Sequence, residues 1–474
     1  MGQKFKKCRP DLAIQLVGGR EKFRPGDTIT GSVDRTAHII TPRALITIKL
    51  YGRSKARINP NTYDRDDAYD FDTSEFKLFD ADDTEQVIFD GPLHIEQSSG
   101  GGTGEAAAWP FAIDIPLCTD PAALRKSGSQ DESFESLDAA GRVLPDTFGF
   151  VDSAAAAAVD ALIEYWLEAT LTAHSANGKS SSYTSIMPVM LSTPHPGPPI
   201  SDFDVQQQKC YKRDRFRSHR LVPGCEHLPL SSTQKMQRLL HSRKVPYLSV
   251  EYEVETPAVI QLNNPTPIPF FLRAVPKWAS TSENLKAVRQ KIRIDSVKVH
   301  ITSFTEAKAS GFITQENQAA DIQVPLCEWT PAEDQEAHIP FLPDDPPLNI
   351  GELVNVLVGW GGRDKSKPGP GVRLFPTFTA YNMAHKNHVL KWTVRLSIAE
   401  ETTELHIVKG VTILPASEQG WAVAGDEPPP PFVARAESWA KPPPEKGAPP
   451  AYCPPGKIQE GEGSGGSSAQ AARK

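Results

Sequence analysis

The sequence predicts an all-β protein with two antiparallel β-sandwich domains in tandem, followed by a disordered proline-rich tail. Apolar residues recur at every second position in many short segments, which is typical of half-buried strands. The chain also contains 43 Pro and 33 Gly residues, which favour turns between short elements. Helical signals are sparse, with one short helix expected around Met236, Leu239 and Leu240 and a turn or two at 154–162.

The alternating segments fall into two blocks. The first block contains segments at 12–16, 29–33, 44–50, 109–117 and 163–171. The pattern restarts near residue 245, with segments at 248–254, 292–301, 353–360, 390–398 and 411–413. Strands at such spacing indicate antiparallel sandwiches. We therefore predict one sandwich in residues 1–195 and a second in residues 246–414.

A turn separates the first two alternating segments. Pro25 presets the turn and Gly26 can adopt a positive φ, while Gly31 in the following segment allows a bulge or close packing.

Several long polar connections interrupt the pattern. Residues 64–85 carry ten acidic residues against two basic ones, and further insertions are expected at 97–108, 120–160 and 363–371. The acidic segment lacks the framework of a calcium loop, so we interpret it as a solvated loop. Segment 196–245 lies between the two blocks and is the predicted interdomain linker.

Composition excludes several classes of function. The net charge of −7 gives no global sign of nucleic-acid binding, and the six cysteines are scattered without C-x-x-C spacing. No segment has the roughly 18 apolar residues of a membrane span, and the N-terminus lacks the apolar core of a signal peptide. No catalytic or metal-binding constellation is evident. We therefore expect no enzymatic activity, metal or cofactor, and a soluble, intracellular protein.

The tail contains a short motif that fits a known class of binding groove. Twenty of the 60 residues at 415–474 are Pro or Gly, above the roughly 25–30% that marks disordered chain. Within it, Pro449-Pro450-Ala451-Tyr452 is a P-P-x-Y sequence. Polyproline II has about three residues per turn, so Pro449 and Tyr452 face the same side, as a WW-domain ligand requires. A rigid spacer is the alternative interpretation. Pro429, Pro430 and Phe432 form a second, weaker candidate, in which Phe replaces the required Tyr.

One strongly basic cluster has two open interpretations. Residues 209–244 contain ten basic residues against two acidic ones. The densest part comprises Lys209, Lys212, Arg213, Arg215, Arg217 and Arg220. It is either a solvated linker that pairs with the acidic loop, or a binding site for anionic lipid headgroups or phosphorylated tails. The same composition could serve RNA binding, which the net negative charge of the chain disfavours.

Several motifs together resemble those of the arrestin family, in particular its fungal α-arrestin branch. They are Phe23-x-Pro25-Gly26-Asp27-x-Ile29-x-Gly31-x-Val33, Ile46-x-Ile48-x-Leu50-x-Gly52, Trp109-Pro110-Phe111 leading into Ile115-Pro116, Tyr165 to Leu171, and Pro376-Thr377-Phe378-x-x-Tyr381-Asn382 with His388. The resemblance covers about residues 10–414 and is strongest at 12–52 and 376–414. It implies two arrestin-like sandwich domains.

The resemblance also implies a function. An α-arrestin-like adaptor would recruit a HECT-type ubiquitin ligase through Pro449, Pro450 and Tyr452. It would bring the ligase to an integral membrane transporter or receptor as cargo and promote ubiquitination and endocytosis. Such a protein is expected in the cytoplasm, recruited peripherally to the plasma membrane or endosomes, with no nucleic-acid partner. Two alternatives remain, a trafficking scaffold without ligase recruitment and, more distantly, a β-sandwich enzyme or carbohydrate-binding module.

Overall fold

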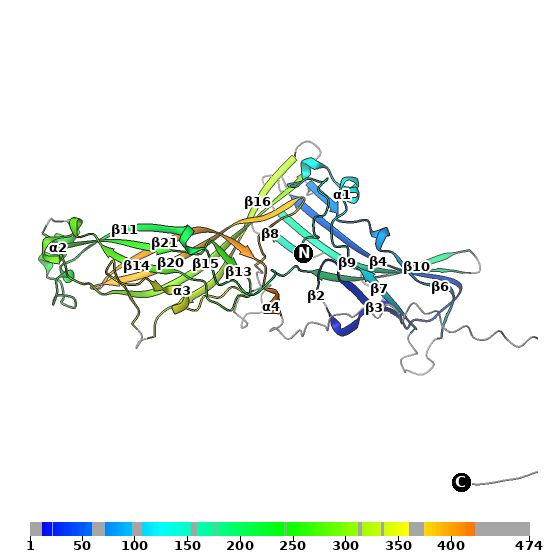
Figure 1. Ribbon diagram of the computed structural model, residues 1–474, viewed down its shortest axis with the longest axis horizontal. Coiled ribbons are helices and arrows are strands. Elements are labelled where there is room, and N and C mark those ends of the chain that lie inside the picture. The colour runs from blue at the N-terminus through cyan, green and yellow to red at the C-terminus, as the bar shows by residue number, and fades with distance from the viewer. Residues whose placement is uncertain are drawn as a thin grey trace, which may run out of the picture. The chain divides into compact units, whose positions relative to one another are not determined.

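The computed structural model describes residues 12–20, 22–58, 72–96, 107–152, 159–175, 178–240, 242, 244–310, 315–332, 336–359 and 374–421. This part of the chain is mostly β, and its sheets form two groups (Figure 1). The predicted all-β class and the predicted tandem of β-sandwiches are therefore confirmed. The prediction of a disordered tail over 415–474 is wrong for its first residues, since Ala416 and Ser417 are buried and Glu418–Trp421 form a helix. The rest of the predicted tail, from position 422 onward, lies outside the described residues.

The first sandwich combines a small and a large sheet. The small sheet has the order β1 (Ala13–Leu16), β3 (Thr28–Arg35) and β7 (Ala107–Asp114). The large sheet has the order β2 (Lys22–Phe23), β10 (Ser180–Leu191), β9 (Val159–His174), β4 (Ile39–Ile58) and β5 (Asp72–Lys77). In addition, β6 (Gln86–Ile95) pairs with β4, and β8 (Phe148–Asp152) pairs with β9.

The second sandwich has a similar plan. Its small sheet has the order β11 (Lys209–Arg217), β12 (Tyr247–Glu255), β14 (Phe271–Pro276) and β18 (Leu348–Asn349). Its large sheet has the order β13 (Val259–Gln261), β21 (Glu401–Leu414), β20 (Met383–Ile398), β15 (Ile292–Ser310) and β16 (Gln315–Trp329). Two further short strands, β17 (His338–Ile339) and β19 (Phe378–Thr379), pair with β15 and β20.

The two large sheets end in the same way. In each, a strand of two or three residues is added in parallel to the edge of an otherwise antiparallel path, β2 beside β10 and β13 beside β21. The antiparallel paths also correspond, since β10-β9-β4-β5 in the first sandwich matches β21-β20-β15-β16 in the second. The two halves are therefore built on one repeated topology.

Alternating burial produces the two cores. In β9, every second residue from Val159 to Ala173 is buried, as the period-two pattern predicts. The core of the second sandwich is centred on large aromatic rings, with Phe270 stacked on Trp392 at 4.3 Å between ring centroids. The first core also includes residues from the second half, among them Tyr381 and Met383.

Helices are short and lie in connections. They are α1 (Pro121–Ser127), α2 (Ser232–Leu239), α3 (Ile350–Leu353) and α4 (Glu418–Trp421). The helix predicted around Met236 and Leu239 is confirmed as α2. Among the described helices, none has the length and apolar character needed to cross a bilayer.

Further sequence predictions are corrected by the structure. Residues 209–217 of the predicted linker form β11, which pairs along its whole length with β12. Residues 72–77 of the predicted acidic loop form β5, and residues 159–162 of the predicted helical turn belong to β9. The predicted strand at 353–360 is absent from the described part, 353–359. There Val354, Val356 and Val358 are alternately buried, but Leu353 ends α3 and the following residues lie in no strand.

The first turn matches its sequence prediction. Gly26 adopts φ +86°, and the turn is closed by Asp27, whose amide donates to the carbonyl of Arg24 at 3.0 Å. Gly31 lies on β3 where the paired strand β1 approaches closely. A Cβ atom at position 31 would lie 2.3 Å from the carbonyl oxygen of Gln15 and 2.6 Å from Cζ of Phe111. Gly31 is therefore required for close packing.

This close approach makes Gly31→Ala a test of the first sandwich. The added methyl group meets backbone, which cannot move aside cheaply, so we expect the free energy of unfolding to fall by about 2 kcal/mol or more. Urea denaturation measures the change. Gly91→Ala in β6 is the matched control, because its Cβ would lie 3.7 Å from Phe89 and should be tolerated. Equal stability of the two variants would show that β1 does not pack as described.

Candidate functional site

The predicted basic cluster is mostly one edge strand. Five of its six residues, Lys209, Lys212, Arg213, Arg215 and Arg217, lie on β11, and Arg220 follows in a short 3₁₀ turn. β11 is the outer strand of the small sheet in the second sandwich. Charged side chains on such an edge discourage pairing with another chain, which gives the cluster a structural role of its own.

A row of glutamates on β12 neutralises part of this strand. Lys209 lies opposite Glu255 and Arg213 lies opposite Glu251, and the ion pairs measure 2.7 Å and 2.6 Å. Glu251 also contacts Lys277, which follows β14. The ammonium group of Lys277 and then the guanidinium group of Arg213 hold the pKa of Glu251 below its ordinary value, so it stays ionised.

The remaining basic residues differ in how they are engaged. Arg220 forms an ion pair with Glu400. Arg215 and Arg217 lie over the ring of Tyr247, at 5.1 and 5.9 Å from its centroid. Lys212 is exposed and forms no ion pair with a described residue. The structure thus brings the six residues together on one strand and its following turn, and three of them are already paired within the protein.

The basic cluster was also predicted to pair with the acidic segment, but the described acids of that segment have other partners. Lys49 on β4 contacts Asp82 at 2.7 Å and Glu85 at 3.2 Å. Glu75 on β5 contacts Arg53 and Lys55, also on β4. Glu75, Asp82 and Glu85 therefore stabilise their own sandwich.

The structure does not describe the predicted WW-domain ligand. Pro449, Pro450 and Tyr452, together with the weaker candidate Pro429, Pro430 and Phe432, lie outside the described residues.

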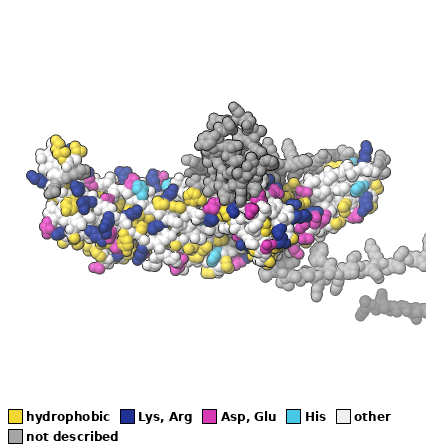
Figure 2. Space-filling model, turned by 90° about the horizontal axis from the view of Figure 1, so that it is seen from above, with side chains coloured by type: hydrophobic (Ala, Val, Ile, Leu, Met, Phe, Trp, Pro, Cys, Tyr) yellow, Lys and Arg dark blue, Asp and Glu magenta, His cyan; other side chains and the backbone are white. Residues whose placement is uncertain are grey.

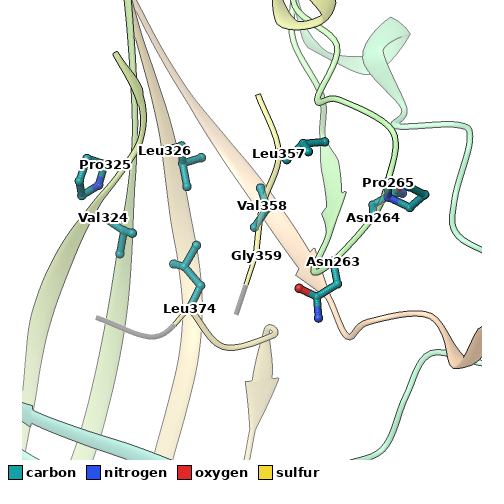
Figure 3. Close-up of a pocket in the computed structure, with 10 residues that line it drawn as sticks. All are labelled: Asn263, Asn264, Pro265, Val324, Pro325, Leu326, Leu357, Val358, Gly359 and Leu374. Carbon is teal, nitrogen blue, oxygen red and sulfur yellow. The ribbon is translucent and has the colours of Figure 1, made fainter. Parts of the chain in front are cut away.

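One pocket lies in the second sandwich and has a volume of about 320 Å³ (Figure 3). It is lined by Asn263, Asn264, Pro265, Val324, Pro325, Leu326, Leu357, Val358, Gly359 and Leu374. The amide of Asn264 is used internally, since Nδ2 donates to the carbonyl of Ile200 and Oδ1 accepts from the amide of Thr266. The lining contains no titratable side chain, so it offers no acid, base or nucleophile. Separately, the described residues contain no group of three or more His, Cys, Asp or Glu placed to hold a metal.

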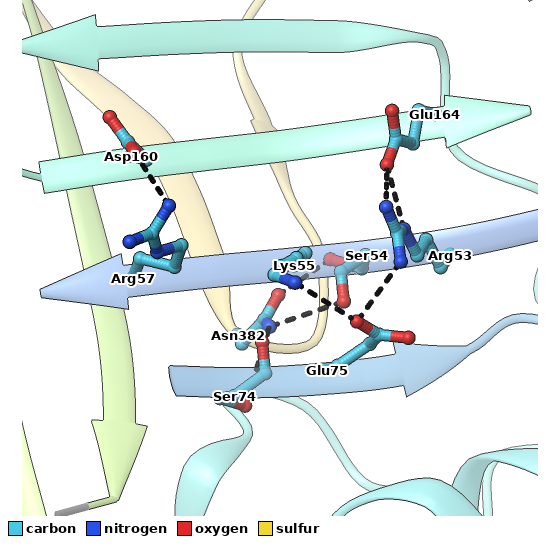
Figure 4. A network of polar contacts seen from close by, with 9 residues as sticks. All are labelled: Arg53, Ser54, Lys55, Arg57, Ser74, Glu75, Asp160, Glu164 and Asn382. Atoms are coloured by element: carbon cyan, nitrogen blue, oxygen red, sulfur yellow. Dashed lines mark hydrogen bonds and ion pairs between the residues drawn. The ribbon is translucent and has the colours of Figure 1, made fainter. Parts of the chain in front are cut away.

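A buried polar network joins the two halves at Asn382 (Figure 4). Asn382 is fully buried, just before β20. Its Oδ1 accepts from the hydroxyl of Ser54 on β4 at 2.5 Å. Its Nδ2 donates to the carbonyl of Ser74 on β5 at 3.0 Å and to that of Ser54 at 3.3 Å. One side chain of the second half thus bridges two strands of the first.

Tyr381 makes the neighbouring contacts. Its hydroxyl lies 2.7 Å from that of Thr119, and its carbonyl accepts from the amide of Phe134 at 2.7 Å. Its ring lies 5.7 Å from that of Phe76, between centroids. The pair Tyr381-Asn382 therefore inserts into the first sandwich through both polar and apolar contacts.

On its outer face, β4 carries a row of ion pairs. Arg53 contacts Glu164 on β9 at 2.5 Å, and Arg57 contacts Asp160, also on β9, at 3.8 Å. Because side chains alternate along a strand, Ser54 points the other way, toward Asn382 (Figure 4). One face of β4 is thus held by ion pairs. The other face contacts the junction, by which we mean Tyr381, Asn382 and the side chains of the first sandwich that they contact.

Two buried histidines complete the junction. His385 packs against Phe148 of the first sandwich and against Phe375 and Phe378 of the second. Its Nδ1 lies 3.0 Å from the hydroxyl of Thr305, and its ring lies 4.7 Å from that of His388. Burial lowers the pKa of His385 to about 3, with a further contribution from His388, and lowers the pKa of His388 to about 4.

Sequence reasoning did not identify this junction as a site. Tyr381, Asn382 and His388 were noted as part of a family-like stretch, without a contact assigned to them. The available signal was a group of polar side chains within an otherwise apolar strand segment, which indicates a specific buried partner.

The comparisons with known proteins add no assignment. A scan against models of known protein families gave no match, and a search of curated proteins also gave none.

A double-mutant cycle tests the Asn382 contact. Asn382→Ala leaves the buried polar groups of Ser54 and Ser74 without this partner, so we expect the free energy of unfolding to fall by about 2–4 kcal/mol. Ser54→Ala should cost about 1 kcal/mol, and the double variant should cost less than the sum. Urea denaturation of the four proteins measures the coupling energy. Strict additivity would contradict a direct contact.

The histidine pair predicts a loss of stability in mild acid. The unfolded chain binds protons below the ordinary pKa of 6.5, whereas the folded chain resists protonation until about pH 4 at His388. Stability should therefore fall as the pH drops from 6.5 toward 4, by about 2 kcal/mol at pH 5 for His388 alone. His388→Leu should reduce this slope, measured by urea denaturation at several pH values.

A buried carboxyl group has the opposite effect on the pH dependence of stability. Comparing the parent protein with His388→Leu cancels this effect. Desolvation raises the pKa of Asp146 to about 6. Lowering the pH below about 6 therefore protonates Asp146 in the folded protein and adds to stability. This contribution is equal in the parent protein and in His388→Leu, and the difference between them isolates His388. Identical slopes for the two proteins would mean that His388 is not excluded from protonation in the folded state.

Proposed function

We propose that this protein is a non-enzymatic adaptor that links a HECT-type ubiquitin ligase to a membrane transporter or receptor. The observation that carries the proposal is Pro449-Pro450-Ala451-Tyr452, placed after two tandem β-sandwiches and within a proline-rich tail. A polyproline II ligand pays little entropy on binding because its backbone is already restricted, which suits a WW-domain groove. The ubiquitin ligase would be recruited by the tail and the cargo by the sandwiches.

The tandem architecture supports this division of labour. The buried junction at Asn382 connects the two sandwiches with specific hydrogen bonds, so they offer loops and edges on a defined scaffold. The resemblance of the 23–52 and 376–398 motifs to α-arrestins supports the same adaptor role, with arrestin-like sandwiches as the cargo-binding part. Recruitment to the plasma membrane or endosomes would follow from the cargo.

Tyr452→Ala tests ligase recruitment directly. An aromatic anchor in a groove typically carries 2 kcal/mol or more of binding free energy, so we expect roughly thirtyfold weaker binding to isolated ligase WW domains. Isothermal titration of the full chain measures the affinity. Thermal denaturation should be unchanged, since the substitution lies outside both sandwiches.

Two controls make the result specific. Ala451→Ser should bind like the parent protein, because position 451 faces away from the groove in polyproline II. Phe432→Ala should have a small effect, since that candidate lacks the tyrosine hydroxyl. If the parent protein and Tyr452→Ala bind WW domains equally, the tail motif is a spacer and the trafficking scaffold without ligase recruitment becomes the better function.

A further inference from the structure

An exposed apolar cluster lies around α2. Leu239 and Leu240 are 76% and 71% exposed, and Met236 and Leu228 are each more than half exposed. Figure 1 shows α2 at one end of the second sandwich, and Figure 2 shows a group of hydrophobic side chains at that end. Leucine side chains exposed singly are ordinary, but four large apolar side chains in one short region indicate a binding surface.

Local contacts fix the orientation of this helix. Ser231 and Gln234 form a reciprocal capping box, with side chain to backbone distances of 3.2 and 2.9 Å. Arg238 forms an ion pair with the largely buried Glu401 on β21. Met236, Leu239 and Leu240 have i, i+3, i+4 spacing and share a face, and Arg238 is turned away from Met236 and Leu240. The ion pair holds one side of α2 to the sandwich and leaves the apolar side outward.

The sequence segment that carries the cluster is basic. Residues 227–250 contain Lys235, Arg238, Arg243 and Lys244 and no acidic residue. Lys235 and Lys244 are exposed, and neither forms an ion pair with a described residue. This differs from β11, where the glutamates of β12 neutralise Lys209 and Arg213.

We propose that Leu228, Met236, Leu239 and Leu240, with Lys235 and Lys244, form a membrane-contact tip that inserts into an anionic bilayer surface. Leucine and methionine side chains gain free energy on leaving water for the acyl region, while lysines are attracted to anionic headgroups and can keep their ammonium groups in water. A helix pinned by Arg238 presents these side chains already ordered. The tip is independent of ligase recruitment by the tail.

The proposed tip differs from the lipid-binding site that the sequence suggested on β11. Lys209, Arg213 and Arg220 are engaged by Glu255, Glu251 and Glu400. A bilayer would have to compete with these ion pairs to use them. In the tip, Lys235 and Lys244 form no ion pair with a described residue, and they lie beside exposed apolar area that β11 lacks except at Tyr211.

The test uses the full chain and sedimentation with phosphatidylcholine vesicles, with or without phosphatidylserine. The parent protein should bind the phosphatidylserine vesicles much more tightly. Leu239→Gln with Leu240→Gln should weaken that binding on the order of a hundredfold, since each inserted leucine accounts for about tenfold. Lys235→Ala and Lys244→Ala should weaken it about fivefold each and reduce its dependence on salt.

A matched control changes two apolar residues exposed elsewhere. Ile40→Thr with Val87→Thr alters β4 and β6 of the first sandwich, where the side chains are comparably exposed, and should bind vesicles like the parent protein. Thermal denaturation should show all variants folded, because none of the substituted side chains is buried.

Three outcomes would overturn the proposal. The parent protein could fail to bind phosphatidylserine vesicles, or the two-leucine variant could bind as well as the parent protein. Alternatively, light scattering could show that the parent protein is a dimer and that the two-leucine variant is a monomer. The last result would assign the exposed leucines to an interface between two copies of this chain.

Discussion

The buried side chain of Asn382 is the constraint on which the tandem arrangement depends. An amide group removed from water costs free energy unless its donors and acceptor are paired. Its partners are Ser54 on β4 and Ser74 on β5, so it is satisfied only when both strands are correctly placed against the second sandwich. Hydrogen bonds are directional and hydrophobic contacts are not. The apolar contacts of Tyr381 and Met383 therefore supply area, and Asn382 fixes the register of the junction.

Many charged side chains are likewise paired within the protein. Both sandwiches contain strands whose outward faces alternate acids and bases across neighbouring strands, as on β4 with β9 and on β11 with β12. These pairs hold strand neighbours in register and, on β11, engage Lys209 and Arg213. A basic composition is therefore a poor guide to a binding surface in this molecule. The region around α2 is informative because its lysines lack acidic neighbours in sequence and its leucines lack a core.

Strand positions could be predicted wherever one face of a strand is buried, and β9 is the clearest case because its alternation is uninterrupted. β11 was missed because an edge strand buries few side chains. Phe216 is buried, but the positions around it are charged and read as linker. The alternation at 354–358 does reflect burial, yet those residues follow α3, which Asn349 caps through the amide of Glu352. The junction could not be predicted, because Asn382 is separated in sequence from Ser54 by 328 positions and from Ser74 by 308 positions. No local pattern encodes contacts at such separations.

The proposed membrane-contact tip lies apart from the junction, and this separation has a physical reason. The junction is built from specific buried contacts, in which His385 packs against Phe148, Phe375 and Phe378 and Asn382 bonds to Ser54 and Ser74. Partners must therefore be met elsewhere, by groups whose folded environment leaves them exposed. The described chain ends at α4, where Arg24 pairs with Glu418 and the hydroxyl of Ser417 donates to the carbonyl of Gly197. In sequence, the proposed WW-domain ligand follows this anchored segment, whereas the proposed membrane-contact tip lies on and around α2. A fixed junction would let the proposed tip meet a bilayer without disturbing the packing between the two sandwiches.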